Sequence, residues 1–476
     1  MKQDTLNHDF EQYCDELLKK YKVPGFSLGL AKEGELFYEK HFGFRDMEAG
    51  LALSPDTIFG IGSITKAFTA IAILQLQEKR KLSVNECVTK YLPEFRTPND
   101  AYTKQMTIHH FLTHSSGLPP MPTLMGAVKK SMEKDPVFTA EQKESIDAIQ
   151  AIDTYAELMD TIAKSDFTLL GPPGAEFSYS NDAFGLLGLI IERVSGKPYE
   201  QYVQENILQP AGMHNSGFQL EDLPGYKDAA VLYDVGNQDG DEIIVRSNNP
   251  WDAPAMRAAG FLKSTVNDML KFTEVIQNDG MIGDERILST ESVRSMTTPH
   301  IQCEQGTYYG YGLMIIPDFF GYKLIHHGGD MKGVTAQMNI LPECHLTGIS
   351  LANLAGAPST KLLFGAFTSY LGKSIETSYL NTENVDLTLE SLKEFEGTFI
   401  SDDGMSLEFY VSNGSLRLAG AGLPDNRLKP SGDDQFLYPM REMEFPVYFM
   451  RNEERKIYRI AFASRQIPKI KNEGHE

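Results

Sequence analysis

The sequence of 476 residues is short of cysteine, of long apolar runs and of positive charge. Its four cysteines stand far apart and form no C-x-x-C pair, which argues against a zinc knuckle or a dithiol redox motif. No apolar run reaches the roughly 18 residues by which a transmembrane helix is recognised. The first residues lack the apolar core and cleavage site of a signal peptide. We therefore expect no membrane partner and a cytoplasmic location.

The charge balance is acidic. The chain has 44 Lys and Arg against 65 Asp and Glu, which gives a formal net charge of -21. Nucleic acid is therefore not expected as a partner, because it would be repelled. The 41% of hydrophobic residues is ordinary for a globular protein and is enough to build a sizeable core.

The pattern of apolar residues divides the chain into two domains, 1–380 and 386–476, joined by a linker at about 374–386. The first domain mixes helical and strand-like segments, with a polar segment over 119–150 that is interpreted as a long loop or lid with some helix. The second shows short alternating runs separated by Gly, Asn, Asp and Pro. It is predicted to be an antiparallel meander that forms a small barrel or sandwich.

The most informative stretch reads FGIGSITKAFTAIAILQLQ. Ser63 and Lys66 stand three residues apart at the start of an apolar helix, so they share a face near the positive end of its dipole. Serine is a weak nucleophile unless a neighbour removes its proton. Lysine can remove it only where desolvation or nearby cations keep the amine neutral. A second S-x-x-K, at 131–134, lies in the polar segment, where water would keep the lysine charged.

Two further motifs follow at wide spacing. A Y-x-N at 179–181 stands between a Pro-Pro-Gly turn and a predicted helix, and an H-x-G at 327–329 lies on a predicted strand. Each has an ordinary structural interpretation when taken alone: a core tyrosine, a capping asparagine, or a strand histidine with satisfied hydrogen bonds. Their order after the S-x-x-K is what favours a functional interpretation.

The three ordered motifs resemble those of the serine β-lactamase and penicillin-binding-protein superfamily. More narrowly, they are similar to its branch of class C β-lactamases, DD-peptidases, D-aminopeptidases and esterases. The resemblance covers about residues 8–375 and extends to TIHHFLTHSSGLP, YSNDAFGLLGLIIERVSGKPY, LQPAGMHNSGF and AAGFLKSTVNDMLKF.

The resemblance implies an α/β (α+β) fold. An antiparallel sheet of five or more strands would be flanked by helices, with a helical lobe from about 80 to 250 and the site between lobe and sheet. Relatives with an added barrel imply that 386–476 is a lipocalin-like domain that shapes the cleft or mediates assembly into a homo-oligomer.

The resemblance also implies roles for the first two motifs. Ser63 is the acylated nucleophile, and Lys66 is its immediate partner in proton transfer. Tyr179 is the second base or acid, and it is expected to act as a phenolate or to share a proton with Lys66, because a cationic lysine would lower its pKa. Asn181 holds the Lys66 ammonium or the substrate carbonyl.

In the third motif, His327 takes the place of a lysine and is expected to donate a hydrogen bond to Tyr179 or to the substrate. Gly329 leaves room for the substrate backbone at the strand edge. The oxyanion hole would combine the backbone N–H groups of Ser63 and Asp330. The reaction would be acyl transfer in two steps through an acyl-enzyme.

No metal and no cofactor are expected. His110 and His114 have the i, i+4 spacing of some metal ligands, but no acidic third ligand is apparent, so a structural role is expected for both.

Two departures from the family pattern bear on the substrate. A permanent cation in place of His327 would suit a substrate carboxylate, as in β-lactams or D-Ala-D-Ala peptides, and a histidine near neutral pH attracts it less. Asp330 stands where a small or hydroxyl residue is expected, and its carboxylate would repel a substrate carboxylate and could receive an ammonium. We therefore expect short peptides or amides, including those with a D-residue, or small esters.

Three alternatives remain open on the sequence. The first is a penicillin-binding or β-lactamase-type enzyme. The second is an acyltransferase that passes the same acyl group to an alcohol or amine. The third is a catalytically inactive scaffold that keeps the fold and binds acyl ligands.

Overall fold

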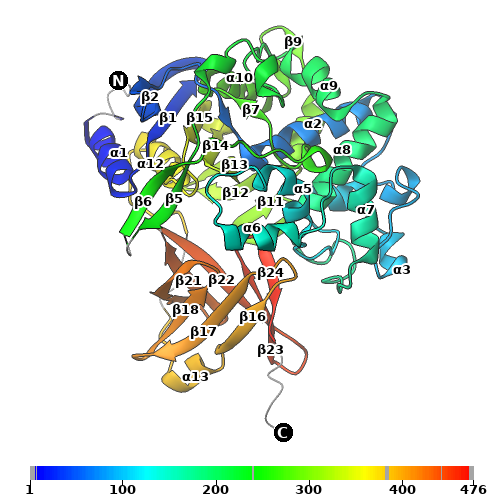
Figure 1. The fold of residues 1–476 in the computed structure, drawn as a ribbon, viewed down its shortest axis with the longest axis vertical. Helices are drawn as coiled ribbons and strands as arrows, with labels where there is room; N and C mark the ends of the chain where they lie inside the picture. The colour runs from blue at the N-terminus through cyan, green and yellow to red at the C-terminus, as the bar shows by residue number, and fades with distance from the viewer. Residues whose placement is uncertain (1–5, 7, 239–240, 381–384, 441, 471–476) are drawn as a thin grey trace.

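The computed structural model describes residues 6, 8–238, 241–380, 385–440 and 442–470 (Figure 1). The larger domain is built on a nine-stranded antiparallel sheet, which confirms the expected architecture. In spatial order its strands are β10 (Ile301–Glu304), β11 (Thr307–Tyr309), β12 (Met314–Phe319), β13 (Tyr322–Met331), β14 (Val334–Leu341), β15 (Leu346–Ala352), β1 (Gly25–Lys32), β2 (Glu35–Asp46) and β3 (Leu51–Ala52). The N-terminal hairpin thus pairs with β15, a strand more than 300 residues later in the chain.

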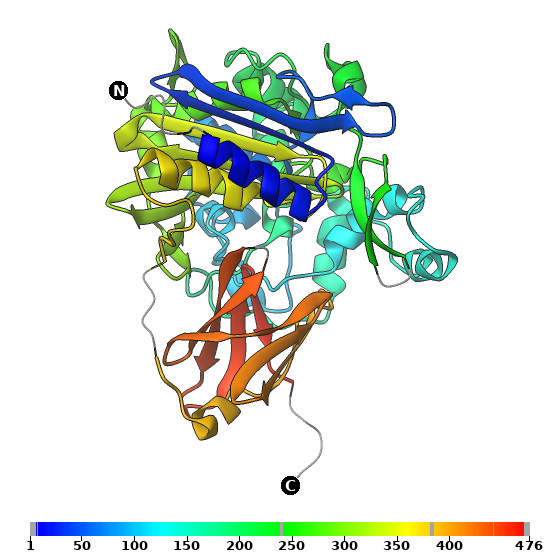
Figure 2. The same ribbon diagram turned by 90° about the vertical axis from the view of Figure 1, so that its left-hand side faces the viewer.

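Helices cover both faces of this sheet. On one face, α1 (His8–Lys20) and α12 (Ser359–Tyr370) lie side by side (Figure 2). On the other face, α10 (Val266–Gln277) packs on β1 and β15. The alternation of strand residues explains the arrangement, because Gly29 faces Val266 of α10 whereas its neighbour Leu30 lies on the α12 side.

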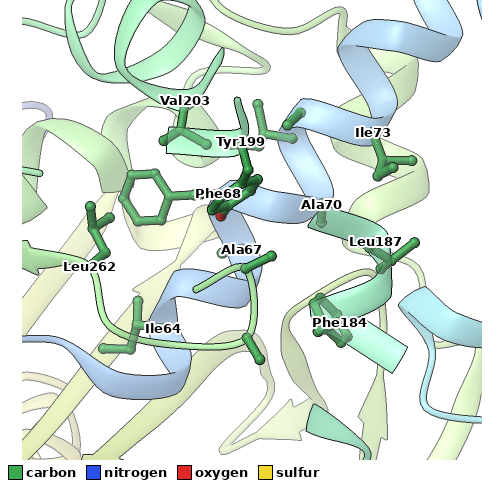
Figure 3. Close-up of a cluster of buried hydrophobic side chains, with 14 of the residues drawn as sticks. Ile64, Ala67, Phe68, Ala70, Ile73, Phe184, Leu187, Tyr199, Val203 and Leu262 are labelled. Carbon is green, nitrogen blue, oxygen red and sulfur yellow. The ribbon is translucent and has the colours of Figure 1, made fainter. Parts of the chain in front are cut away.

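The helical lobe is organised around α2 (Thr65–Glu78), which is buried over almost its whole length. Figure 3 shows its side chains packed against Phe184 and Leu187 of α8 (Asn181–Ser195) and against Tyr199 and Val203 of α9 (Tyr199–Val203). A helix that is apolar all round requires such surroundings. The other lobe helices are α3 (Asp100–Thr103), α4 (Ile108–Leu112), α5 (Thr123–Met132), α6 (Ala140–Asp147) and α7 (Tyr155–Lys164).

The segment 119–150 contains α5 and α6, so it carries more helix than a loop would. Two smaller hairpins complete this domain: β5 (Tyr233–Gln238) with β6 (Asp241–Arg246), and β8 (Met281–Ile282) with β9 (Glu285–Arg286). The helix α11 (Thr290–Met296) leads into β10.

The C-terminal region forms a separate all-β unit after α13 (Leu389–Lys393). One sheet holds β16 (Gly397–Ile400), β17 (Ser406–Ser412), β18 (Ser415–Gly420) and β19 (Leu423–Arg427). The other holds β20 (Lys429–Gly432), β21 (Gln435–Met440), β22 (Met443–Arg451), β23 (Ile457–Phe462) and β24 (Arg465–Pro468).

The two C-terminal sheets enclose a core of their own, in which Phe399, Phe409, Phe436 and Phe449 are buried. A bridge between Phe399 and Lys469 joins β16 to the chain just after β24. The expected antiparallel meander is therefore present, while the lipocalin-like assignment remains a prediction. No helix in the described part of the chain has both the length and the apolar character that spanning a bilayer requires.

Candidate active site

Ser63 lies in a short 3-10 turn (Gly62–Ile64) that leads directly into α2. The turn packs against β13 so closely that a side chain at either of two glycines would collide. A Cβ at Gly62 would stand 2.8 Å from the nitrogen of Asp330, and one at Gly329 would stand 2.0 Å from the oxygen of Ile61. Gly62 also has φ +51°, which glycine adopts without strain. These two glycines therefore let the nucleophile turn and the strand meet.

The same close approach places two backbone N–H groups together. A Cβ at Gly329 would lie 3.2 Å from the nitrogen of Ser63, and the one at Gly62 would lie 2.8 Å from the nitrogen of Asp330. Both N–H groups thus stand at the contact between the 3-10 turn and β13. An oxyanion hole formed by these two N–H groups stays a prediction.

Lys66 is fully buried one helical turn after the serine. Its Nζ lies 3.1 Å from Ser63 Oγ, 2.8 Å from Asn181 Oδ1 and 2.6 Å from the carbonyl oxygen of Ala259. Burial lowers the pKa of Lys66 well below its ordinary value, which favours the neutral amine. A neutral amine has two N–H groups and one lone pair. As an ammonium, Lys66 donates to Ser63, Asn181 and Ala259 alike. In the neutral form, N–H groups directed to Asn181 and Ala259 would leave the lone pair facing the Ser63 hydroxyl.

Asn181 is the first residue of α8, and it is not the N-cap. That role belongs to Ser180, whose Oγ accepts from the N–H of Ala183 at 3.1 Å. Because Ser180 caps the helix, the Asn181 amide oxygen remains available to accept from Lys66. Sequence reasoning had left the capping role open to Asn181.

Tyr179 faces both of these groups. Its ring lies 4.6 Å from Lys66 Nζ, and its hydroxyl is hydrogen-bonded to Ser63. Burial raises the pKa of Tyr179 above its ordinary value. The hydrogen bond with Ser63 offsets the rise in part, the Asp330 carboxylate adds to it and Arg465 opposes it. The raised pKa disfavours the expected phenolate, because desolvation is the largest contribution to it, and a proton shared with Lys66 stays a prediction.

His327 is buried behind the tyrosine and is held in one tautomer. Its Nδ1 lies 2.6 Å from the oxygen of Gly328, and its Nε2 lies 2.9 Å from the hydroxyl of Tyr309. A carbonyl can only accept, so Nδ1 carries the proton and Nε2 accepts from Tyr309. Burial lowers the pKa of His327 to about 3, so the ring is neutral. The predicted hydrogen bond from His327 to Tyr179 or to the substrate is accordingly replaced by one received from Tyr309.

The ring of His114 packs against the ring of Tyr179. The two rings are stacked at 4.1 Å, and His114 Nδ1 accepts from the N–H of Ser180 at 3.0 Å. His110 is engaged at its own helix start, where Nδ1 accepts from the N–H of Thr107 at 3.1 Å. Both rings thus have structural bonds. Among the described residues, no group of three or more His, Cys, Asp or Glu is placed to hold a metal ion.

The C-terminal domain reaches the site through the turn between β23 and β24. The carbonyl oxygen of Ser464 accepts from the N–H of Tyr179 at 3.2 Å. Gln466 donates to the oxygen of Phe177 at 3.0 Å, and Arg459 forms an ion pair with Glu176 at 2.9 Å. Sequence reasoning missed these contacts, and it also missed Tyr309 and Ala259, because no motif or period links residues so far apart in the chain.

A small cavity of about 130 Å³ opens beside the nucleophile. Ser63, Asn181 and Asp330 are among the residues that line it, and most of its surface is apolar. Phe261 in this wall has φ +79°, a left-handed backbone that is uncommon for a bulky residue and is tolerated only where the surroundings impose it. The site therefore brings together Ser63, the buried Lys66, the backbone nitrogens of Ser63 and Asp330, and an adjoining apolar recess.

Comparison with known sequences agrees with this geometry. Residues 10–363 match the family model described as Beta-lactamase. Protein flp of Staphylococcus aureus (strain MW2) is 31% identical over 255 residues, which are 52% of this chain and 46% of that protein. The chain thus spans about half the length of the curated relatives it matches.

Two solved structures extend the comparison. The octameric penicillin-binding protein homologue from Pyrococcus abyssi is 30% identical, with a TM-score of 0.66 over 96% of this chain and 99% of that chain. EstCE1, described as a hydrolase with promiscuous acyltransferase activity, shares the fold at 21% identity. Its TM-score is 0.58 over 74% of this chain and 95% of that chain. Oligomerisation of the present chain remains a prediction.

Proposed function

The chain belongs to the Beta-lactamase family, and we propose that it is a serine hydrolase that forms an acyl-enzyme at Ser63. Its substrates would be small peptides or amides, including those with a D-residue, or small esters. The observation that carries the proposal is the position of Lys66 Nζ, which lies within hydrogen-bond distance of Ser63 Oγ, Asn181 Oδ1 and the Ala259 oxygen. A neutral Lys66 held in this way could bond to Asn181 and Ala259 through its N–H groups and offer its lone pair to the serine hydroxyl.

The first step follows from that geometry. Ser63 Oγ attacks the substrate carbonyl carbon as its proton passes to Lys66 Nζ, and a general base of this kind contributes roughly 10²–10⁴-fold in rate. The negative charge that develops on the carbonyl oxygen is stabilised by the N–H groups of Ser63 and Asp330. Lys66 becomes an ammonium whose charge is stabilised by hydrogen bonds to the oxygens of Asn181 and Ala259, which are already in place.

The neutral Tyr179 suits the second half of this step. Its hydroxyl can give a proton to the departing nitrogen or oxygen and be reprotonated from the Lys66 ammonium. Lys66 is then neutral again and can take a proton from the water that attacks the acyl-enzyme. Release of the acid restores the free Ser63 hydroxyl. The cycle uses only groups within contact of the nucleophile.

Charge around the site favours substrates without a carboxylate next to the reacting bond. His327 is neutral and bonded to Tyr309, so it supplies no cation. Asp330, whose side chain is exposed beside the cavity, places a negative charge there. We propose that this carboxylate receives an ammonium and repels carboxylates, which disfavours penicillins and D-Ala-D-Ala peptides as substrates. If Asp330→Ser improved turnover of amine-bearing substrates, this role would be wrong.

Intact-mass spectrometry after exposure to a fluorophosphonate, and separately to a penicillin, tests the proposal. We expect one fluorophosphonate adduct in the wild type, its loss in Ser63→Ala, and its retention in Ser131→Ala, which removes the serine of the second S-x-x-K. No adduct in folded wild type would point to the inactive scaffold. A stable penicillin adduct would restore the penicillin-recognising alternative and contradict the role given to Asp330.

A further inference from the structure

We propose that the cavity beside Ser63 is a recess for an uncharged aliphatic substituent of about four carbon atoms on the acyl group, and that the buried carboxylate of Asp135 fixes its wall from behind. The inference rests on the proposed acyl-enzyme chemistry and specifies the acyl class that this chemistry takes.

The helix α5 supplies one wall of the recess. Leu124, Met125 and Val128 all line the cavity, and their i, i+1, i+4 spacing puts them on one side of the helix. Trp251 and Met331 line it from other segments. Aliphatic and aromatic surfaces of this kind gain free energy by covering an apolar group, and they offer no hydrogen bond to a polar one.

Asp135 holds this wall together although it is itself fully buried. Its carboxylate accepts from Trp251 Nε1 at 2.9 Å and from the Ser247 hydroxyl at 3.1 Å, and it pairs with Lys332 Nζ at 3.1 Å. The single carboxylate thereby links the chain after α5, the Trp251 segment and the turn after β13. A buried carboxylate satisfied on several sides is strongly directional, so it fixes the indole that lines the recess.

The only lysine in the cavity wall is not available to a ligand. Lys332 also pairs with Asp234, and its ammonium lies 5.6 Å from the centre of the Trp251 ring and 5.7 Å from that of Phe138. Its side chain is only 7% exposed. A substrate carboxylate in the recess would therefore meet Asp330 and find no free cation among the lining residues.

The position of the cavity assigns it to the acyl side of the substrate. It is lined by Gly62, Ser63 and Asp330, the residues around the paired N–H groups, but not by Tyr179. Tyr179 would protonate the leaving group, so the leaving group lies toward Tyr179 and the acyl substituent lies toward α5. A volume of about 130 Å³ is room for roughly four groups of the size of a water molecule.

The experiment is a chain-length series of p-nitrophenyl esters, which share one leaving group. We expect kcat/KM to rise about fourfold per methylene from acetate to butyrate, the gain expected for a buried methylene, and to fall at octanoate. The p-nitrophenyl monoester of succinic acid, close to butyrate in length but anionic, should be turned over at least tenfold less efficiently than butyrate.

Variants separate the recess from general effects on the fold. Leu124→Ala should move the optimum to a longer chain, whereas Met132→Ala, a truncation on the same helix outside the cavity lining, should leave the optimum at butyrate. Asp135→Asn should lower the butyrate-to-acetate ratio and raise the relative rate with the succinate ester, because Lys332 loses a partner.

The outcomes are distinguishable from failure of the proposed function. Each protein is also titrated with the fluorophosphonate, and absence of labelling would reject the acyl-enzyme itself. A labelled, active wild type with a flat chain-length profile, an optimum at octanoate, or a preference for the succinate ester would overturn the aliphatic recess. An unchanged profile in both Leu124→Ala and Asp135→Asn would do the same.

Discussion

At the scale of single residues, the chemistry depends on how burial divides protons between Lys66 and Tyr179. The lysine loses its proton easily, because its ammonium would be desolvated, and the tyrosine keeps its proton for the same reason. Burial thus favours the neutral form of both groups, and a neutral Lys66 would offer the serine proton a lone pair. In the proposed reaction this pair acts as base and acid, and Asp330 and Arg465 are the charges that act on Tyr179.

This division predicts the pH dependence. Neutral Lys66 is the active form, so kcat/KM should be lost as pH falls through a lysine pKa well below the ordinary 10.5 and should stay level above it, because the raised pKa of Tyr179 keeps the phenol protonated. Lys66→Arg, which cannot become neutral, should lower kcat/KM roughly 10²–10⁴-fold. Rates measured from pH 5 to 10 check both points.

Lys134→Arg in the second S-x-x-K is the matched control and should leave the profile unaltered. An acidic limb near pH 10 in the wild type, or a Lys66→Arg variant within tenfold of it, would contradict a neutral lysine base.

The same residues show what could be predicted from the sequence. The order of the S-x-x-K, Y-x-N and H-x-G motifs, and their resemblance to those of a known superfamily, were sufficient to predict that Ser63, Lys66 and Tyr179 share one site. Their protonation states were not predictable, because desolvation is set by what packs around each group. His327 shows this most clearly: its tautomer depends on Tyr309, which no local pattern connects to it.

At the scale of elements, one buried contact ties the helix over the cavity to the helix that carries Asn181. The hydroxyl of Thr123, at the start of α5, lies 2.5 Å from Asp182 Oδ1 in the first turn of α8. Burial raises the pKa of Asp182 from an ordinary 3.8 to about 6, and the bond from Thr123 limits the rise. The segment 119–150 looked like a loop in the sequence because it is rich in polar residues, although Met121, Val128, Met132 and Ile146 are buried in the main hydrophobic cluster.

The raised pKa of Asp182 determines how its contribution to the free energy of unfolding changes with pH. The folded state binds the proton more tightly than the unfolded chain, so this contribution is complete below pH 3.8 and is lost as pH rises through about 6. Asp182→Asn carries no such titration. Its free energy of unfolding, relative to wild type, should therefore increase by about 1–2 kcal/mol between pH 5 and pH 8.

Urea titrations at the two pH values measure that difference. The exposed Asp222→Asn is the matched substitution, and its difference from wild type should be the same at both pH values. If the free energy of unfolding of Asp182→Asn relative to wild type is constant or decreases from pH 5 to pH 8, Asp182 is ionised in the folded state at both pH values.

At the scale of the whole molecule, the C-terminal β-domain is part of the construction of the site. Figures 1 and 2 show it set against one end of the larger domain, and its β23–β24 turn bonds to the backbone of Tyr179 and of Phe177. The composition change near residue 385 was enough to predict a separate β unit. The turn's contact with the site was not predictable, because it joins two domains across several hundred residues of sequence.

Loosening this contact should affect catalysis. Arg459 bonds to the oxygen of Leu170 at 3.2 Å and pairs with Glu176, both on the segment that leads to Tyr179. We expect Arg459→Met to lower kcat/KM about tenfold, since a small misplacement of a catalytic group costs up to roughly 10²-fold. Steady-state kinetics with thermal melting measure the effect.

Arg417→Met is the matched control, because Arg417 pairs with Asp425 within the same domain, on β18 and β19. It should retain wild-type kcat/KM. Equal losses in the two variants would mean that the domain as a whole, and not the contact at Tyr179, is responsible.

The hydrogen bond between Tyr179 and Ser464 also sets a condition on when the protein becomes active during its synthesis. Ser63 and Lys66 leave the ribosome early and Ser464 late, and at about 5–20 residues per second the interval is roughly 20–80 s. Through that interval the growing chain carries its nucleophile without the turn that fixes the tyrosine. If the proposed function holds, a nascent chain would be a poor acyl acceptor, and full reactivity would require that the β-domain has been translated and has docked.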